Sequence, residues 1–337
     1  SWLEWEDGLR KRDSHSLWEF KSSHEDDVMF WEFVQFKFFE QWNKLKKYAN
    51  DNGVSIIGDI PIYVALDSAD TWSHPELFQL SEGCVPKAVA GVPPDAFSAT
   101  GQLWGNPLYD WEYHKKTGYD WWILRIGYSY RLYDIVRVDH FRGFEAYFSI
   151  PYEDETAVNG HWEKGPDFEL FAAMKMKLGK KEMIAEDLGV ITPPVRKMIK
   201  KCGYPGMKVL QFAFDSYDSE YLPHNYDKNC IVYTGTHDNQ TTRGWYEENN
   251  RKVQKYIREY LRVKSGKDVV EAMIATAMSS TAGTAVIPMQ DWLGLGREAR
   301  MNFPSTLGDN WKWRLTDGQL TDALAAHMKD VTKTYCR

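Results

Sequence analysis

The sequence predicts an α/β fold, specifically a (β/α)8 TIM-type barrel of which this chain holds strands 3 to 8. Short apolar runs typical of buried parallel strands alternate with helical patterns along the chain. Each run ends in an acidic residue, at the end of the strand where barrels of this kind carry their chemistry. A doubly wound sheet would show the same alternation, but no glycine-rich phosphate loop follows any run, so we favour the barrel.

The apolar runs are predicted to be strands, and the helical patterns between them connect one strand to the next. The first long helix, 30–52, has one stripe of aromatic and aliphatic side chains and ends near Gly53. The predicted strands are 54–61, 133–139, 182–189, 209–215, 230–238 and 284–291. The later predicted helices are 121–133, 167–178, 193–202, 250–264, 268–281 and 318–333. Trp311 and Trp313 are expected in the core.

The domain organisation follows from the number of strands. A closed barrel needs eight strands, and residues 1–30 are too polar to supply two more, so we expect the first two β/α units to be absent from this chain. Residues 1–337 then form a single barrel domain. Residues 61–112, rich in Pro, Gly and aromatic side chains, are too long for a connection and are predicted to be an inserted lid or substrate loop. Residues 151–165 are a short insertion.

The composition excludes several classes of function. A net charge of −7 argues against nucleic acid or an anionic membrane as a partner and suits a neutral substrate. The 4 cysteines are scattered without metal-ligand spacing, which favours a reducing cytoplasm, and neither a metal nor a cofactor is expected. The 15 Trp, 19 Tyr and 16 Phe, many of them in loop-like stretches, favour carbohydrate because such rings stack on sugars.

The acids at the strand ends define the candidate chemistry. Side chains alternate along a strand, so Arg137 and Asp139 point the same way, and the guanidinium favours the ionised carboxylate. A structural Arg–Asp pair would look the same in sequence. Glycoside cleavage needs one ionised and one protonated carboxyl, and Glu186, with no cation near it in the sequence, is the candidate acid beside Asp139 as nucleophile. Metal binding is disfavoured by the neighbouring Arg137, His140 and His237.

Several longer motifs carry a resemblance to a known family. The stretch 137–143, Arg-Val-Asp-His-Phe-Arg-Gly, is one of them. The others are 57–64, 92–95, 101–107, 184–189, 235–239 and 300–304. In this order they resemble the amylomaltases, the 4-α-glucanotransferases or disproportionating enzymes related to the α-amylases. Members of that family carry further residues before the equivalent of residue 1, which agrees with the two missing units.

The resemblance implies roles for individual residues. Asp139 would be the nucleophile, Glu186 the general acid and base, and Asp238 a third acid that grips sugar hydroxyls. The substrate contacts it implies are Arg137, His140, His237, Asp59, Asp95, Phe97, Gln102, Trp104 and Asn302. The activity would be retaining transfer of α-1,4-glucan segments between maltooligosaccharides, in starch, glycogen or maltose metabolism, by a cytoplasmic monomer or homodimer.

Two alternatives remain open from the sequence. One is a hydrolase of the α-amylase type acting on the same glucans. The other is a glucan-binding protein that has lost catalysis, against which the presence of all three acids argues.

Overall fold

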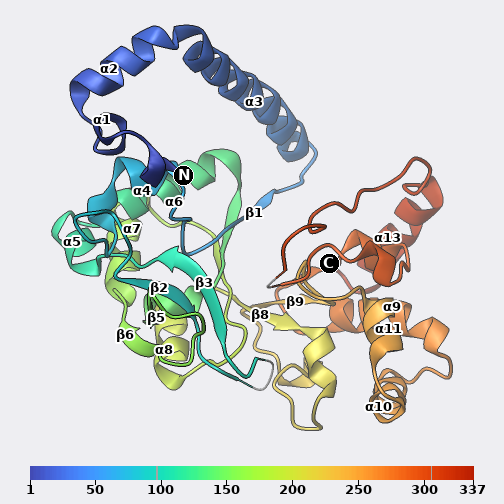
Figure 1. Ribbon diagram of the computed structural model, residues 1–337. Coiled ribbons are helices and arrows are strands. Elements are labelled where there is room, and N and C mark those ends of the chain that lie inside the picture. Colours follow the sequence, from blue (N-terminus) through green and yellow to red (C-terminus); the bar gives the residue numbers. More distant parts are fainter. Residues whose placement is uncertain (96–97, 305) are drawn as a thin grey trace. The chain divides into compact units, whose positions relative to one another are not determined.

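The computed structural model describes residues 1–95, 98–304 and 306–337. These residues form two compact units, Ser1–Tyr204 and Pro205–Arg337. In Figure 1 the first unit runs from blue to yellow-green and the second from yellow to red. Each unit has its own parallel strands, its own covering helices and its own apolar core.

The first unit contains most of the secondary structure. Its helices are α1 (Asp7–Arg10), α2 (Ser14–Ser23), α3 (Glu25–Asp51), α4 (Ala69–Ser73), α5 (Trp111–Lys116), α6 (Asp120–Leu132), α7 (Phe168–Leu178) and α8 (Pro193–Cys202). Its strands are β1 (Ile57–Ile60), β2 (Ala88–Val92), β3 (Gln102–Pro107), β4 (Ile135–Val138), β5 (Ala146–Pro151), β6 (His161–Lys164) and β7 (Met183–Ala185).

The second unit is mainly helical around three short strands. Its helices are α9 (Thr242–Glu248), α10 (Arg251–Leu261), α11 (Val269–Ser279), α12 (Met289–Trp292) and α13 (Asp322–Thr334). Its strands are β8 (Gly206–Val209), β9 (Cys230–Tyr233) and β10 (Thr284–Val286).

Parallel strands pair in chain order in both units, which confirms the predicted α/β class. In the first unit the order is β1-β4-β7, and in the second it is β10-β9-β8. The register places Asp59 of β1 opposite Arg137 of β4. Because paired positions of neighbouring strands project to the same face, this register brings a carboxylate and a guanidinium side by side.

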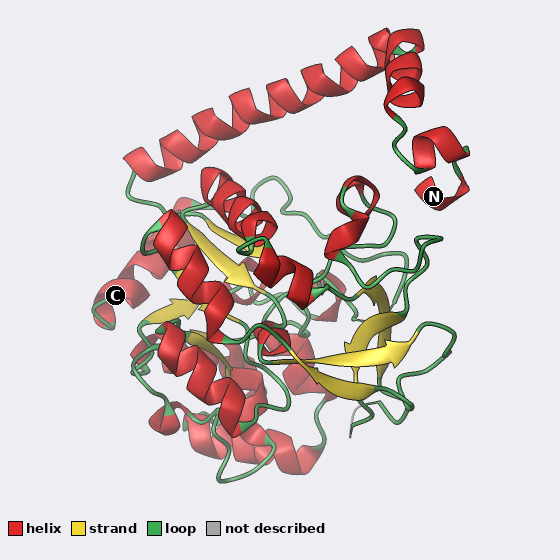
Figure 2. Ribbon diagram, turned by 90° about the vertical axis from the view of Figure 1, so that its left-hand side faces the viewer, coloured by secondary structure: helices red, strands yellow, loops and turns green. Residues whose placement is uncertain are grey.

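Residues 61–112, predicted to be an inserted lid or substrate loop, contain regular secondary structure. Two strands of this region, β2 and β3, join β5 and β6 in an antiparallel sheet of order β3-β2-β5-β6. The insertion predicted at 151–165 also contributes, since it contains β6. Gly101 has a φ of +69°, and a Cβ there would lie 2.4 Å from the carbonyl oxygen of Val92, so glycine permits the chain to return along β2. Figure 2 shows this sheet in yellow.

The strand predicted at 209–215 was placed too late in the chain. The strand is β8, Gly206–Val209, and residues Leu210–Phe214 form a 3₁₀ helix. Leu210, Ala213 and Phe214 of this helix are buried together in the core of the second unit. A short apolar stretch that is buried on several sides has no strand periodicity, and tertiary packing selects its conformation.

Trp122 of α6 is at the centre of the aromatic core of the first unit. It is 0% exposed, and its ring centroid lies 5.2–5.3 Å from those of Tyr109, Trp121 and Phe144. Such clustering fixes α6 against the strands, and α6 leads directly to β4 and Asp139.

The Trp122→Ala variant is therefore expected to lose about 3–5 kcal/mol of stability, because a large cavity opens in a close-packed region. Denaturant unfolding followed by circular dichroism measures the change. Leu124→Ala, on the same helix but 71% exposed, is the control and should change stability by less than about 0.5 kcal/mol. Equal losses in the two variants would contradict this account of the core.

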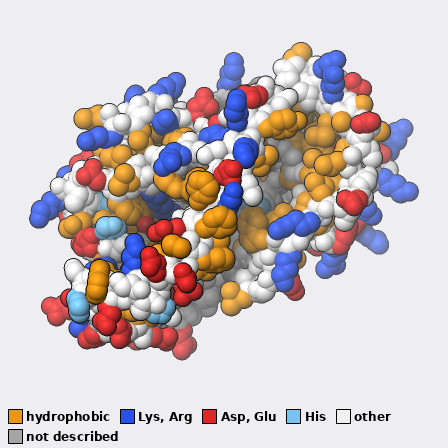
Figure 3. Space-filling view, turned by 90° about the horizontal axis from the view of Figure 1, so that it is seen from above, with side chains coloured by type: hydrophobic (Ala, Val, Ile, Leu, Met, Phe, Trp, Pro, Cys, Tyr) orange, Lys and Arg blue, Asp and Glu red, His pale blue; other side chains and the backbone are white. Residues whose placement is uncertain are grey.

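The helix α3 begins earlier than predicted, at Glu25, and none of its described side chains is buried. In its second half, Trp42 Nε1 donates to the carbonyl oxygen of Leu132 at 2.9 Å, and the Phe39 ring contacts the Tyr128 ring of α6. Its first half exposes a series of apolar side chains, namely Met29, Phe30, Trp31, Phe33, Phe36 and Phe38. Figure 2 shows the length of α3, and Figure 3 shows exposed hydrophobic side chains in orange.

Within the described part of the chain, each helix is too short or too polar to span a bilayer.

Candidate active site

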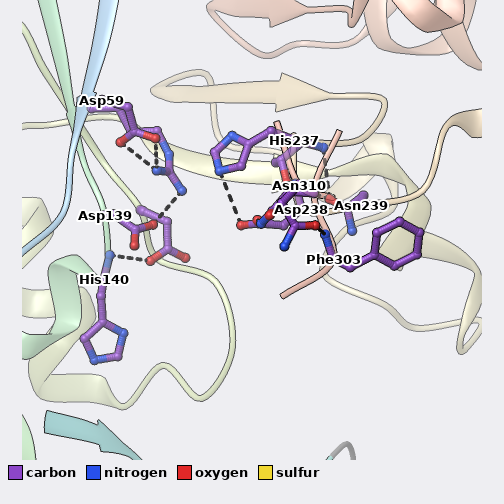
Figure 4. A network of polar contacts seen from close by, with 12 residues as sticks. Asp59, Asp139, His140, His237, Asp238, Asn239, Phe303 and Asn310 are labelled. Atoms are coloured by element: carbon purple, nitrogen blue, oxygen red, sulfur yellow. Dashed lines mark hydrogen bonds and ion pairs between the residues drawn. The ribbon is translucent and has the colours of Figure 1, made fainter. Parts of the chain in front are cut away.

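The first unit brings two predicted carboxylates to one guanidinium. Arg137 Nη1 donates to both carboxylate oxygens of Asp59 at 2.6 and 2.7 Å, and Nη2 donates to Asp139 Oδ1 at 2.9 Å. Burial alone would lower the pKa of Arg137, but the charges of Asp59 and Asp139 raise it overall, so the guanidinium stays charged. Figure 4 shows both pairs as dashed lines. Arg137 therefore fixes Asp139 at the carboxyl end of β4 and favours its ionised form.

Glu186 follows β7 and is buried beside Asp139. Burial and the Asp139 charge raise the pKa of Glu186 to about 7, although Arg137 and two backbone hydrogen bonds act in the opposite direction. The backbone N–H of His140 donates to Oε2 at 2.8 Å, and that of Leu188 donates to Oε1 at 2.7 Å. These bonds fix the carboxyl group, and the raised pKa leaves a large fraction of it protonated near neutral pH.

His140 positions Glu186 through its backbone. Its backbone is left-handed, with φ of 51°, which aims its N–H at Glu186. Burial and the charge of Arg142 lower the pKa of the imidazole to about 3, so the ring is neutral. Its buried Nε2 atom has no hydrogen-bond partner among the described residues. The Trp104 ring packs edge-on against the imidazole, with the two ring centroids 4.8 Å apart.

The inserted sheet brings Gln102 and Trp104 to this cluster. Both residues lie in β3, and Gln102 Oε1 accepts from the indole N–H of Trp104 at 3.1 Å. Asp95 lies in the loop after β2, where its carboxylate accepts from the backbone N–H of Ser98 at 2.8 Å. The predicted contact Phe97 lies outside the described residues.

The second unit brings together the other predicted residues, His237, Asp238 and Asn302. Asn302 Nδ2 donates to Asp238 Oδ1 at 2.7 Å, and His237 Nε2 lies 3.4 Å from Asp238 Oδ2. Arg300 Nη2 donates to the backbone carbonyl of Asp238 at 2.9 Å. Figure 4 shows His237 directed at the Asp238 carboxylate. The loop after β9 thus presents a half-exposed carboxylate in a fixed position.

A buried aspartate that the sequence reasoning did not single out holds both ends of this loop. Asp291 Oδ2 accepts from the hydroxyls of Thr234 and Thr242 at 2.6 and 2.7 Å, and Oδ1 accepts from the Thr242 backbone N–H at 2.8 Å. Thr234 follows β9, and Thr242 begins α9. The sequence placed Asp291 at the end of a strand, but it lies in α12 and is 2% exposed. The sequence carried no signal for this role, because the two threonines that Asp291 binds lie 57 and 49 positions away from it.

The Asp291→Ala variant is expected to lose about 3 kcal/mol of stability, because it leaves three buried donors without an acceptor. Since these donors fix the loop that carries Asp238, KM for a substrate bound by this loop should also rise. Thermal unfolding and initial-rate kinetics measure the two effects. The exposed Asp317→Ala variant is the control, and a similar behaviour of both variants would show that Asp291 does not hold the loop.

Known proteins resemble this chain along almost its whole length. A sequence profile described as 4-alpha-glucanotransferase matches residues 1–321. A 4-alpha-glucanotransferase from Clostridium butyricum is 49% identical over 340 residues, covering 100% of this chain and 70% of that protein. The chloroplastic/amyloplastic 4-alpha-glucanotransferase of Solanum tuberosum is 45% identical, with 100% of this chain and 59% of that protein covered.

A solved structure is also closely similar. The amylomaltase from Streptococcus agalactiae in complex with acarbose has a TM-score of 0.97 and 41% identity, covering 100% of this chain and 69% of that chain. The amylomaltase from Corynebacterium glutamicum has a TM-score of 0.73 at 21% identity, covering 93% of this chain and 50% of that chain, which supports the fold alone. Nearly the whole of this chain is matched, and it spans about two thirds of the length of several of these relatives.

Proposed function

Because this chain belongs to the 4-alpha-glucanotransferase family and is an enzyme of that activity, we propose that it moves α-1,4-glucan segments between maltooligosaccharides by a retaining double displacement. The observation that supports this mechanism is that two carboxyl groups of the first unit have environments that favour opposite protonation states. Asp139 is paired with a guanidinium, while Glu186 is buried with its pKa raised to about 7. An ionised nucleophile and a protonated acid are what this chemistry requires.

In the first step, an Asp139 oxygen attacks the anomeric carbon of the donor glucan, and the bond from that carbon to the glycosidic oxygen breaks. Glu186 gives its proton to the departing oxygen, so the shortened glucan leaves as an alcohol. In the second step, the hydroxyl of an acceptor glucan attacks the same carbon, Glu186 takes its proton, and the bond to Asp139 breaks. Two inversions return the original configuration.

The remaining predicted residues are proposed to hold the sugar. Asp238 would accept hydrogen bonds from ring hydroxyls, with Asn302 and His237 positioning its carboxylate. Further sugar contacts are proposed for Arg137, His140, Asp59, Asp95, Phe97, Gln102 and Trp104. Among these, the contact proposed for Trp104 is supported by the packing of its ring against His140. In this position Trp104 would form a wall, contributed by the inserted region 61–112, that excludes water from the substrate.

We also propose that the enzyme acts in the cytoplasm on neutral glucans, as a monomer or a homodimer. The four cysteines are free thiols at separate places, which suits a reducing compartment. The charge of −7 suits an uncharged substrate better than a nucleic acid.

The deciding experiment incubates the purified chain with maltotriose and follows chain length, free glucose and total reducing ends together. Transfer is expected to give glucose and a ladder of longer maltooligosaccharides while the number of reducing ends stays constant. A rise in reducing ends would identify a hydrolase instead, and an unchanged maltotriose would contradict the proposed activity of this chain.

A further inference from the structure

Trp311 in the second unit is placed unlike the core residue expected from its sequence. Its side chain is 52% exposed, and its backbone has a φ of 62°, in the left-handed region that a bulky residue rarely adopts. Both features are unfavourable for folding, since one leaves an indole in water and the other strains the chain. Strain that persists at an exposed aromatic residue points to a function.

The backbone around Trp311 is held in this conformation by hydrogen bonds on both sides. Its N–H donates to the carbonyl oxygen of Met301 at 2.8 Å. Its own carbonyl accepts from Arg314 Nη1 at 2.9 Å, and the same nitrogen donates to the carbonyl of Trp313 at 2.8 Å. Hydrogen bonds of the segment itself therefore support this backbone conformation.

The indole ring lies against the residue that precedes Asp238. The ring centroids of Trp311 and His237 are 4.9 Å apart with an interplanar angle of 42°. Trp311, His237 and Asn239 line a pocket of about 140 Å³, together with Thr236 and Arg300. Both chain neighbours of Asp238 thus face the same pocket as the indole, while Asn302 fixes the Asp238 carboxylate itself.

This combination has the chemistry of a sugar-binding surface. A pyranose ring has an apolar face of C–H groups and an edge of hydroxyls. An exposed indole offers an apolar face of matching size, and amide, imidazole and hydroxyl groups beside it can exchange hydrogen bonds with the edge.

We propose that Trp311 is a binding platform on which one glucosyl residue of an α-1,4-glucan stacks, next to the residue held by Asp238. The inference rests on the proposed function, because it assumes that the glucan passes this part of the second unit. It adds a contact that the sequence motifs did not suggest, and it assigns Trp311 to substrate binding rather than to the chemical steps.

The test compares Trp311→Leu with Trp311→Phe. Both substitutions keep a Cβ and therefore the same backbone strain, and they differ in whether an aromatic ring remains. Tyr217→Leu, at a second exposed aromatic position of the same unit, is the control. Binding of maltoheptaose is measured by calorimetry in a Glu186→Gln background, and KM and kcat are measured in the chain with Glu186 intact. Thermal unfolding shows that each variant is folded.

Trp311→Leu is expected to weaken maltoheptaose binding and raise KM by about tenfold, while kcat changes by less than about threefold. Trp311→Phe should restore most of the affinity, and the Tyr217 variant should match the parent. Unchanged binding by Trp311→Leu, or a fall in kcat without a change in KM, would contradict a role of Trp311 in substrate binding. Either result would indicate that the indole only packs against His237. A parent chain that binds maltoheptaose without rearranging it would contradict the proposed function, and the calorimetric comparison would still decide the role of Trp311.

Discussion

Replacement of Asp139 by asparagine is expected to lower glucan transfer by at least about 10⁴-fold, because the amide cannot form the covalent bond to the sugar. The fold should be retained. The introduced amide keeps an oxygen that can accept from Arg137 Nη2, and Asp59 holds Nη1 of the same guanidinium with both of its oxygens. The loss would then report on chemistry and not on unfolding.

The measurement for Asp139→Asn is turnover of maltotriose, together with mass spectrometry of the protein after brief mixing with a maltosyl fluoride. The parent chain should gain the mass of a glycosyl group, and the variant should not. Asp59→Asn serves for comparison, since it removes a charge from Arg137 but leaves the nucleophile, and it should lose far less activity. Substantial turnover by Asp139→Asn would exclude this residue as the nucleophile.

The same variant also tests the coupling between the two carboxyl groups. The charge of Asp139 contributes to the raised pKa of Glu186, so removing it should bring that pKa down towards its ordinary value of 4.5. Titration of the carboxyl followed by infrared or NMR spectroscopy would detect the shift. An unchanged pKa would mean that burial alone sets the protonation of Glu186.

Glu186→Gln is expected to reduce turnover of maltooligosaccharides by about 10³-fold or more while leaving their binding largely intact. The reason is that glutamine keeps the size and the hydrogen-bonding oxygen but cannot donate a proton to the glycosidic oxygen. A maltosyl fluoride needs no such proton, so the first step should survive and the covalent intermediate should accumulate. Equal losses with both donors would contradict the assignment of Glu186 as the acid.

The pH dependence of the parent chain follows from the same group. Glu186 acts as an acid only when protonated, so kcat/KM should fall as pH rises through about 7. This alkaline limb should be absent from the residual activity of Glu186→Gln. Glu182→Gln, at the exposed position before β7, is the control and should keep the parent profile.

Folding stability should respond to pH through the same carboxyl. Between about 4.5 and 7 the folded state holds a proton on Glu186 that the unfolded state has released, so the free energy of unfolding falls as pH rises across this window. Glu186→Gln lacks this titrating group. The free energy of unfolding should therefore fall less from pH 5 to pH 8 in this variant than in the parent. Denaturant unfolding at the two pH values measures the difference.

The strand-end acids of the first unit could be predicted from the sequence because the prediction depends on local pattern alone. An apolar run followed by Arg137 and Asp139 places both side chains on one face, and the register with Asp59 confirms that arrangement. The α/β class follows from the same alternation of runs and helices. Asp238 could be found only through its motif, since it lies in a loop well past the end of β9.

The features that sequence did not predict depend on contacts between distant segments. Asp291 binds threonines 49 and 57 positions away, and no local pattern distinguishes it from an exposed acid at a helix start. The inserted sheet pairs β2 with β5 across more than one intervening element, and its glycines hide the strand periodicity. Trp311 was misassigned because an aromatic residue in an unknown environment is most often buried, whereas its strained backbone becomes visible only in three dimensions.

The exposed aromatic half of α3 has a consequence for work with the purified protein. At low ionic strength the net charge of −7 keeps molecules apart, but salt screens this repulsion and strongly hydrated anions such as sulfate favour contacts between apolar surfaces. Self-association through these rings should therefore set in as ammonium sulfate is added, and a phenyl matrix should retain the protein under the same conditions. Kinetic comparisons among the variants belong in dilute buffer, where an apparent loss of rate cannot arise from aggregation.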